Sequence, residues 1–172
     1  GLIYRGEYIV NWCPRCETAI SDIEVDYRDI PSFLYYVRYP IKEHPEQYLV
    51  VATTRPETIL GDVALAVHPD DIRYRHVTSL TVVLPIIGRE MGIIQDEYVD
   101  PQFGTGVLKV TPAHDMNDFD LGKKHHLPVI PVINPDGIMN DNAGIFAGMT
   151  REQCRKEIVE KLRLLSSERI EL

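Results

Sequence analysis

The 172 residues suffice for one domain, or for one domain with a small appendage. The hydrophobic fraction of 44% and the charged fraction of 26% are typical of a globular protein, and no apolar run approaches the roughly 18 residues of a membrane helix. The net charge of −8 argues against a protein that grips a long nucleic-acid duplex through its phosphates. It still allows a protein that holds a few nucleotides at one end of an RNA.

The first residue and the cysteines indicate the kind of protein and the cellular compartment to expect. It begins at Gly1 rather than Met and has no signal-peptide pattern, so we expect a piece of a longer protein. Cys13 and Cys16 form a CxxC pair, and Cys154 stands alone. An odd count of three is not a disulfide framework and favours a reducing, cytoplasmic setting.

In chain order, the pattern predicts short strands first. Residues 1–30 are typical of short strands and turns around the CxxC knuckle. A hairpin follows, and then Pro56 is expected to open a turn of helix that Gly61 ends. The strands expected from apolar and β-branched runs are 33–39, 48–54, 63–67, 81–84, 86–89, 92–95 and 106–111. This spacing predicts a small closed or half-closed sheet rather than alternating βαβ units.

The last third of the sequence predicts two helices. Residues 115–126 have acids first and bases last, which suits the two ends of a helix dipole. A strand is expected at 128–133 and a turn at 134–137. A helix is expected at 151–165, because Thr150 and Gln153 have capping-box spacing. We divide the chain into the knuckle region 1–30, a main domain 31–165 and a tail or linker 166–172.

The run TTRPET, residues 53–58, is the first candidate for chemistry. Three threonine hydroxyls, the Arg55 guanidinium and a carboxylate lie within six residues at the end of an apolar strand. Such hydroxyls can bind a small polar ligand or orient a water, and an arginine suits a phosphate or carboxylate. The alternative is an ordinary strand end with threonines on a pleated surface.

The run GTGVLKVTPAHDMNDFD, residues 104–120, is the second candidate. Lys109 and Thr111 alternate along a strand and so point to one face, and a helix begins after His114. Asp115 and Asp118 are three residues apart and are expected on one side of its first turn. The alternative makes Asp115 a helix N-cap and Asp118 a favourable first-turn charge. The spacing matches no common metal-binding pattern, so we expect no metal here.

The third candidate is CPRC, residues 13–16. A redox pair would need a helix directly after Cys16, whereas the following residues alternate polar and apolar as in a strand. A zinc knuckle fits better, but tetrahedral zinc needs four ligands. We therefore expect Cys13 and Cys16 to be half of a zinc site whose other ligands are histidines or lie outside the chain.

Three runs in this order, NWCPRCETAISDIEV, VVATTRPETILGD and GTGVLKVTPAHDMNDFDLGKKHHLPVI, give the chain a family resemblance that covers nearly all of residues 1–165. It resembles the insertion that edits mischarged tRNA in valyl-, isoleucyl- and leucyl-tRNA synthetases. The reading TTRPET favours the valyl branch, since leucyl enzymes usually read TTRPDT and isoleucyl enzymes carry a Trp and further Thr. The ATP-using HIGH and KMSKS signatures are missing, so we expect no amino-acid activation by this chain.

The resemblance implies a β-rich α+β fold, a small β-barrel decorated with helices. It implies hydrolysis of threonyl-tRNA that carries the valine acceptor, at the tRNA 3′ end, within a larger parent synthetase. No cofactor is implied for editing, and zinc at Cys13 and Cys16 is tied to the parent. We expect a cytoplasmic monomer that contacts no membrane. The residues carried over from the family are Thr53, Thr54, Arg55 and Thr58 for one pocket wall, and Phe103, Lys109, Thr111, Asp115 and Asp118 for the other.

The roles that follow are hypotheses. In such enzymes the acid at the position of Asp118 holds the α-ammonium of the amino acid. We assign the reading of the threonine hydroxyl to Lys109, Thr111 and Asp115, and the placing of water and the terminal adenosine to Thr53 and Thr54. The alternatives are editing for the isoleucyl or leucyl branch, a tRNA 3′-end binding module without hydrolytic power, and a redox protein built on CPRC.

Overall fold

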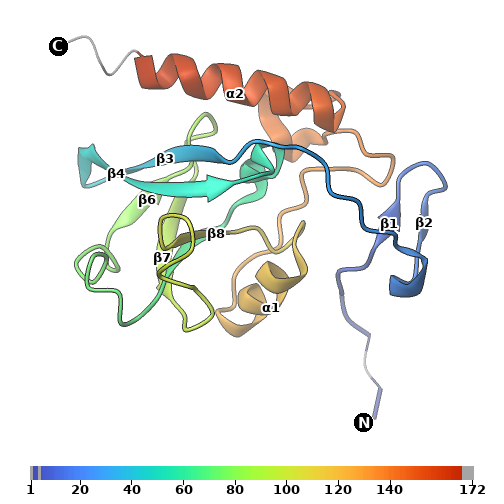
Figure 1. Ribbon diagram of the computed structural model, residues 1–172, viewed down its shortest axis with the longest axis horizontal. Helices are drawn as coiled ribbons and strands as arrows, with labels where there is room; N and C mark the ends of the chain where they lie inside the picture. Colours follow the sequence, from blue (N-terminus) through green and yellow to red (C-terminus); the bar gives the residue numbers. More distant parts are fainter. Residues whose placement is uncertain (1, 4, 168–172) are drawn as a thin grey trace.

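Two long strands begin the main sheet of the computed structural model, which describes residues 2–3 and 5–167 (Figure 1). Strands β3 (Tyr35–Ile41) and β4 (His44–Thr53) pair antiparallel, which confirms the predicted hairpin. Because side chains alternate across a strand, Val37, Tyr39 and Ile41 all enter the core from β3.

Four shorter strands complete a six-stranded sheet: β5 (Ala64–Val67), β6 (Thr81–Val83), β7 (Glu90–Gln95) and β8 (Val107–Val110). The strand order is β4-β3-β6-β7-β5-β8, and only β5 and β7 pair in parallel. The edge strands β4 and β8 lie against each other, and the Thr105 hydroxyl donates to the Val50 carbonyl at 2.5 Å. The sheet therefore curls into a half-barrel, which confirms the expected β-rich α+β fold.

Among the described residues, two α-helices and three short 3₁₀ helices accompany the sheet. Helix α1 (Met116–Lys124) follows β8, and α2 (Arg151–Ser167) runs across one end of the sheet, where it packs on η2 (Pro56–Gly61) (Figure 1). The other 3₁₀ helices are η1 (Asp22–Glu24) and η3 (Asp141–Phe146). No helix among the described residues combines the length and apolar character needed to cross a bilayer.

Helix α2 begins as predicted. The Thr150 amide donates to the Gln153 side chain at 3.0 Å, and the Gln153 amide donates to the Thr150 hydroxyl at 3.2 Å. These reciprocal bonds are the capping box. Cys154 is fully buried on the inner face of the helix, where burial raises the pKa of its thiol to about 12. It is therefore a packing residue. Of the expected tail, residues 168–172 lie outside those described.

The knuckle region forms a separate small sheet, in which β1 (Trp12–Cys13) pairs with β2 (Thr18–Ala19). The Trp12 indole N–H donates to the Pro135 carbonyl at 2.8 Å. This bond fastens the knuckle to a segment more than a hundred residues further along the chain.

Two of the predicted strands are wrong. Residues 86–89 form the turn between β6 and β7, because Pro85 interrupts the run and Ile86 and Gly88 have φ of 71° and 78°. Residues 128–133 form no strand and have a single bridge, from Ile133 to Met139. Prolines 128 and 131 lack the amide hydrogens that a ladder needs.

Candidate active site

The TTRPET run crosses from the end of β4 into η2. The Thr53 hydroxyl accepts the Arg55 amide at 3.1 Å, and the Thr58 hydroxyl donates to the Arg55 carbonyl at 3.0 Å. These bonds shape the turn, yet the Thr53 hydroxyl keeps its proton for another acceptor. Thr54 is exposed, and no hydrogen bond from its side chain is found within the described chain. At the end of η2, a Cβ on Gly61 would lie 2.9 Å from the Ile130 carbonyl oxygen, so only glycine permits this close approach.

The junction of β8 and α1 forms the facing wall. Asp115 is the N-cap of α1, and its carboxylate accepts the amides of Asn117 and Asp118 at 2.9 and 3.2 Å. The Asp118 carboxylate turns inward and accepts the Thr111 amide at 2.9 Å. Both interpretations of Asp115 thus remain open, because a carboxylate that caps a helix through one oxygen has another to offer a ligand.

One pocket of about 300 Å³ joins the two runs. All nine residues that the sequence singled out for the two walls line it: Thr53, Thr54, Arg55, Thr58, Phe103, Lys109, Thr111, Asp115 and Asp118. Their roles remain to be tested. Phe103 stands at the rim, 73% exposed, whereas Asp118 is 5% exposed. The pocket therefore combines an open aromatic edge with a buried acidic floor.

Two ionisable groups of this pocket, Asp118 and His114, have shifted pKa values. Burial raises the pKa of Asp118 to about 6, against the opposing effects of the Thr111 amide and Lys109. Burial, with the nearby charges of Arg55 and Lys109, lowers the pKa of His114 to about 4. The His114 Nε2 accepts the Val132 amide at 2.9 Å. His114 is therefore neutral near pH 7 and ties the junction to the 130s segment, and that nitrogen has no free lone pair with which to act as a base.

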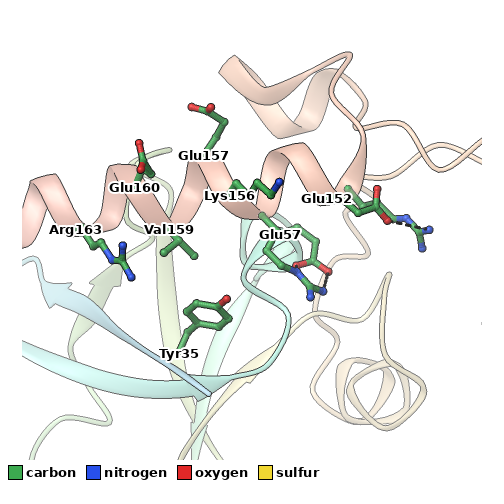
Figure 2. A pocket seen from close by; sticks show the side chains of 10 residues that line it. Tyr35, Glu57, Glu152, Lys156, Glu157, Val159, Glu160 and Arg163 are labelled. Atoms are coloured by element: carbon green, nitrogen blue, oxygen red, sulfur yellow. Dashed lines mark hydrogen bonds and ion pairs between the residues drawn. The ribbon is translucent and has the colours of Figure 1, made fainter. Parts of the chain in front are cut away.

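A charged network holds the TTRPET turn from behind. The Glu57 carboxylate, buried under α2 as Figure 2 shows, accepts two hydrogen bonds from Arg155 at 2.7 and 2.8 Å. On its other side Arg55 lies 3.9 Å from Glu57 and donates to the His114 carbonyl at 3.0 Å. Arg55 thus links the two pocket walls, and α2 sets the position of the turn from which it comes.

A larger groove of about 720 Å³ runs along α2 (Figure 2). Its lining is mostly long charged side chains from one exposed helix face, and its buried acid, Glu57, is already neutralised by Arg155. Buried, convergent polar groups mark a reaction site better than size does. We therefore take the smaller pocket as the candidate site.

The CPRC knuckle supplies two thiols and no more. A hydrogen bond from the Cys16 backbone lowers the pKa of Cys13, and the hydrogen bond with Cys13 raises the pKa of Cys16. The redox alternative requires a helix directly after Cys16, whereas the structure has the strand β2 there. The redox alternative is therefore wrong. Among the described residues no three His, Cys, Asp or Glu side chains gather around a common point. The residues present therefore do not by themselves fit a tetrahedral zinc ion.

The pocket residues expected from sequence leave out four side chains that support the pocket: Tyr39, Glu57, Asp62 and His114. Tyr39 and Asp62 are both buried, and the Tyr39 hydroxyl donates a hydrogen bond to Asp62 Oδ2 at 2.6 Å. The available signal for Asp62 was an acid set within the apolar run ILGDVALAV, where an unpaired charge would be costly.

Comparison with known proteins agrees with this geometry. The family model for the leucyl-tRNA synthetase editing domain matches residues 72–163, more than half of the chain. The valine–tRNA ligase of Anoxybacillus flavithermus is 60% identical over 162 residues, which are 94% of this chain and 18% of that protein. The valine–tRNA ligase of Thermotoga maritima is 54% identical over 94% of this chain and 19% of its own length. The chain thus spans about a fifth of these relatives.

A solved structure shares the fold. In a LeuRS–tRNA–LeuAMS ternary complex from Agrobacterium radiobacter, the synthetase matches 79% of this chain and 19% of its own, with a TM-score of 0.61 and 22% identity. An identity of 22% supports a shared fold alone. The identities of 60% and 54% to valine–tRNA ligases support the assignment to the valyl branch. The chain therefore belongs to the editing domains of class I aminoacyl-tRNA synthetases and is homologous to the editing region of the valyl enzymes.

Proposed function

We propose that this domain hydrolyses threonine from threonyl-tRNA that carries the valine acceptor. Threonine differs from valine by a hydroxyl in place of a methyl. An apolar synthetic pocket cannot strongly reject such an isostere, and valyl-tRNA synthetase is itself the usual example of this limit. A second, polar pocket selects in the opposite direction, since valine would leave its buried polar groups unpaired.

The observation that carries the proposal is the meeting of two chemistries in one pocket. Asp118 supplies a buried carboxylate, while Lys109 and Thr111 supply polar groups on the neighbouring strand end. A carboxylate suits the α-ammonium that every aminoacyl ester carries. The hydroxyl-binding groups suit the feature that distinguishes threonine from valine.

The remaining roles follow from position. Thr53, which is buried, and Thr54, which is exposed, place the attacking water and the terminal adenosine. Arg55, which is half exposed, lies where a ribose or phosphate would enter. The neutral, bonded His114 argues against a histidine general base. An aminoacyl ester is already activated, so the positioning of water and the stabilisation of charge provide the catalysis, with a ribose hydroxyl as an additional aid.

Replacement of Asp118 by Ala tests the central residue. We expect deacylation of threonyl-tRNA to be lost, by about a hundredfold or more, because a charge-assisted contact to the ammonium disappears. Asp120→Ala is the matched control, since Asp120 is an exposed acid on the same helix. Circular dichroism checks that both variants are folded. Full activity of Asp118→Ala would show that the role belongs elsewhere.

A second candidate is a tRNA 3′-end binding module without hydrolytic power of its own, and the net charge of −8 favours its dependence on the parent enzyme. An acidic domain gains little affinity from the phosphate backbone. In that case the parent supplies the main grip on tRNA, in the cytoplasm where charging takes place. A zinc ion at Cys13 and Cys16 would likewise need ligands from the parent.

A further inference from the structure

A buried carboxylate lies directly behind the polar wall of the pocket. Asp62 is fully buried and does not line the cavity. Its Oδ2 accepts the Tyr39 hydroxyl at 2.6 Å, and its Oδ1 accepts the Thr111 hydroxyl at 2.5 Å. The Lys109 ammonium lies 3.5 Å from the same Oδ1. Three donors thus converge on one acid: one from β3, one from β8 and one from the residue that follows β8.

Burial raises the pKa of Asp62, while the Lys109 charge and the hydrogen bonds of Thr111 and Tyr39 oppose that rise. This donor set favours the ionised carboxylate. A buried charge is tolerated when it is paired and hydrogen-bonded, and Lys109, with a side chain only 12% exposed, provides the opposite charge. An ionised carboxylate can only accept, so the single hydroxyl proton of Thr111 must point toward Asp62. The Thr111 oxygen then accepts from Lys109, whose ammonium lies 2.5 Å away.

The order of these bonds decides what the pocket can offer. Thr111 has no proton left for a ligand. Lys109 spends one N–H on Thr111 and directs a second toward Asp62, which leaves one for the cavity that it lines. The wall therefore presents a donor to the amino-acid side chain. A threonine hydroxyl can accept from this donor, and a valine methyl cannot.

We propose that Asp62, held by Tyr39, is a positioning residue that fixes the direction of the Lys109–Thr111 hydrogen bonds and thereby sets the preference for threonine over valine. The inference rests on the proposed function and deepens it, since it explains how the same pocket distinguishes the two amino acids. Asp62 itself contacts no substrate.

Binding of two non-hydrolysable probes tests this. The probes are the threonyl and valyl amides of 3′-amino-3′-deoxyadenosine, and calorimetry measures their affinities. We expect the wild-type chain to prefer the threonyl amide. Asp62→Asn removes the charge that faces Lys109 and replaces one acceptor by an N–H₂, so the Lys109–Thr111 hydrogen bonds are no longer fixed and the preference should fall about tenfold or more. Tyr39→Phe keeps the Asp62 carboxylate but removes the hydrogen bond to its Oδ2. This variant should lower the preference for the threonyl amide about threefold.

Two matched variants control for a merely structural loss. Asp71 is a buried acid that pairs with Arg73, and the Tyr74 hydroxyl donates to the Thr105 carbonyl; neither lines the pocket. Asp71→Asn and Tyr74→Phe are expected to lose stability and keep the threonyl preference. If Asp62→Asn does not fold, Tyr39→Phe against Tyr74→Phe decides the question.

A measurement without ligand completes the test. Nitrogen-15 NMR of the lysine ammonium groups should show faster exchange of the Lys109 protons with water in Asp62→Asn than in the wild type. Unchanged exchange and unchanged preference would overturn the inference and leave the proposed function standing. Binding of neither probe by the wild type would overturn the proposed function and this inference with it.

Discussion

At the scale of single residues, Asp118 shows a conflict between stability and function. A carboxylate that is 5% exposed is unfavourable when ionised, which is why its pKa rises to about 6. Between pH 4 and 6 the folded chain therefore holds a proton that the unfolded chain has released. Stability from this group is present below pH 4 and is lost as the pH rises through 6.

Asp118→Asn should accordingly stabilise the domain at pH 7.5, because an amide keeps the acceptor for the Thr111 amide without the charge. The expected gain is about 1–3 kcal/mol, from a shift of about two pKa units. Urea unfolding at pH 7.5 and pH 4 measures it, and the gain should vanish at pH 4. Asp120→Asn, an exposed neighbour, should change little. A less stable Asp118→Asn at pH 7.5 would mean that the ionised carboxylate is a favourable part of the fold.

Sequence alone located the residues of the pocket better than the residues that support them. The hydroxyls of TTRPET and the acids of the 104–120 run are concentrated in short segments, so their chemistry is visible locally. The bonds of Asp62 to Tyr39 and Thr111 span 23 and 49 residues. The local sequence pattern does not indicate partners this far apart. The hydrogen bond from the Val132 amide to His114 likewise depends on a contact that only the fold creates.

At the scale of elements, α2 packs on η2, and the Glu57–Arg155 pair ties the TTRPET turn to this helix. The Glu57 side chain is 4% exposed, and Arg155 satisfies it with two hydrogen bonds. Removal of Arg155 leaves the buried Glu57 carboxylate beside the more distant Arg55, whose Nε lies 3.9 Å from Glu57 Oε1. A helix outside the pocket thereby determines the geometry of one of its walls.

Arg155→Met should destabilise the chain by about 1–3 kcal/mol, less than for a fully buried pair because Arg155 is 38% exposed. Adding Glu57→Gln should recover part of this loss, since no buried charge then remains. Thermal unfolding of the single and double variants measures both effects, with Lys156→Met on the exposed face of α2 as the control. Equal melting temperatures for Arg155→Met and Lys156→Met would rule out this role for the pair.

Local pattern also explains which elements were foreseeable. The β3–β4 hairpin and the capped start of α2 follow from adjacent residues, and both were predicted. The parallel pairing of β5 with β7 depends instead on how the sheet curls around its core. The apolar residues at 86–89 and 128–133 suited strands, but a left-handed Ile86 and two prolines prevented them.

At the scale of the whole molecule, the chain is an acidic domain that matches about a fifth of the length of its relatives. Both walls of the pocket come from described residues of the chain. The net charge of −8 opposes binding of the chain to the phosphates of tRNA. We therefore expect chemistry that is selective but, in the absence of the parent enzyme, limited by weak tRNA binding.

The most direct test of this account is the release of threonine and valine from the same tRNA. Threonyl-tRNA and valyl-tRNA, both with the valine acceptor, are incubated with the chain at high enzyme concentration, and the initial rates are compared. We expect threonine to be released at least about tenfold faster than valine, because valine leaves buried polar groups of the pocket unpaired. Equal release of the two amino acids, or faster release of valine, would contradict it.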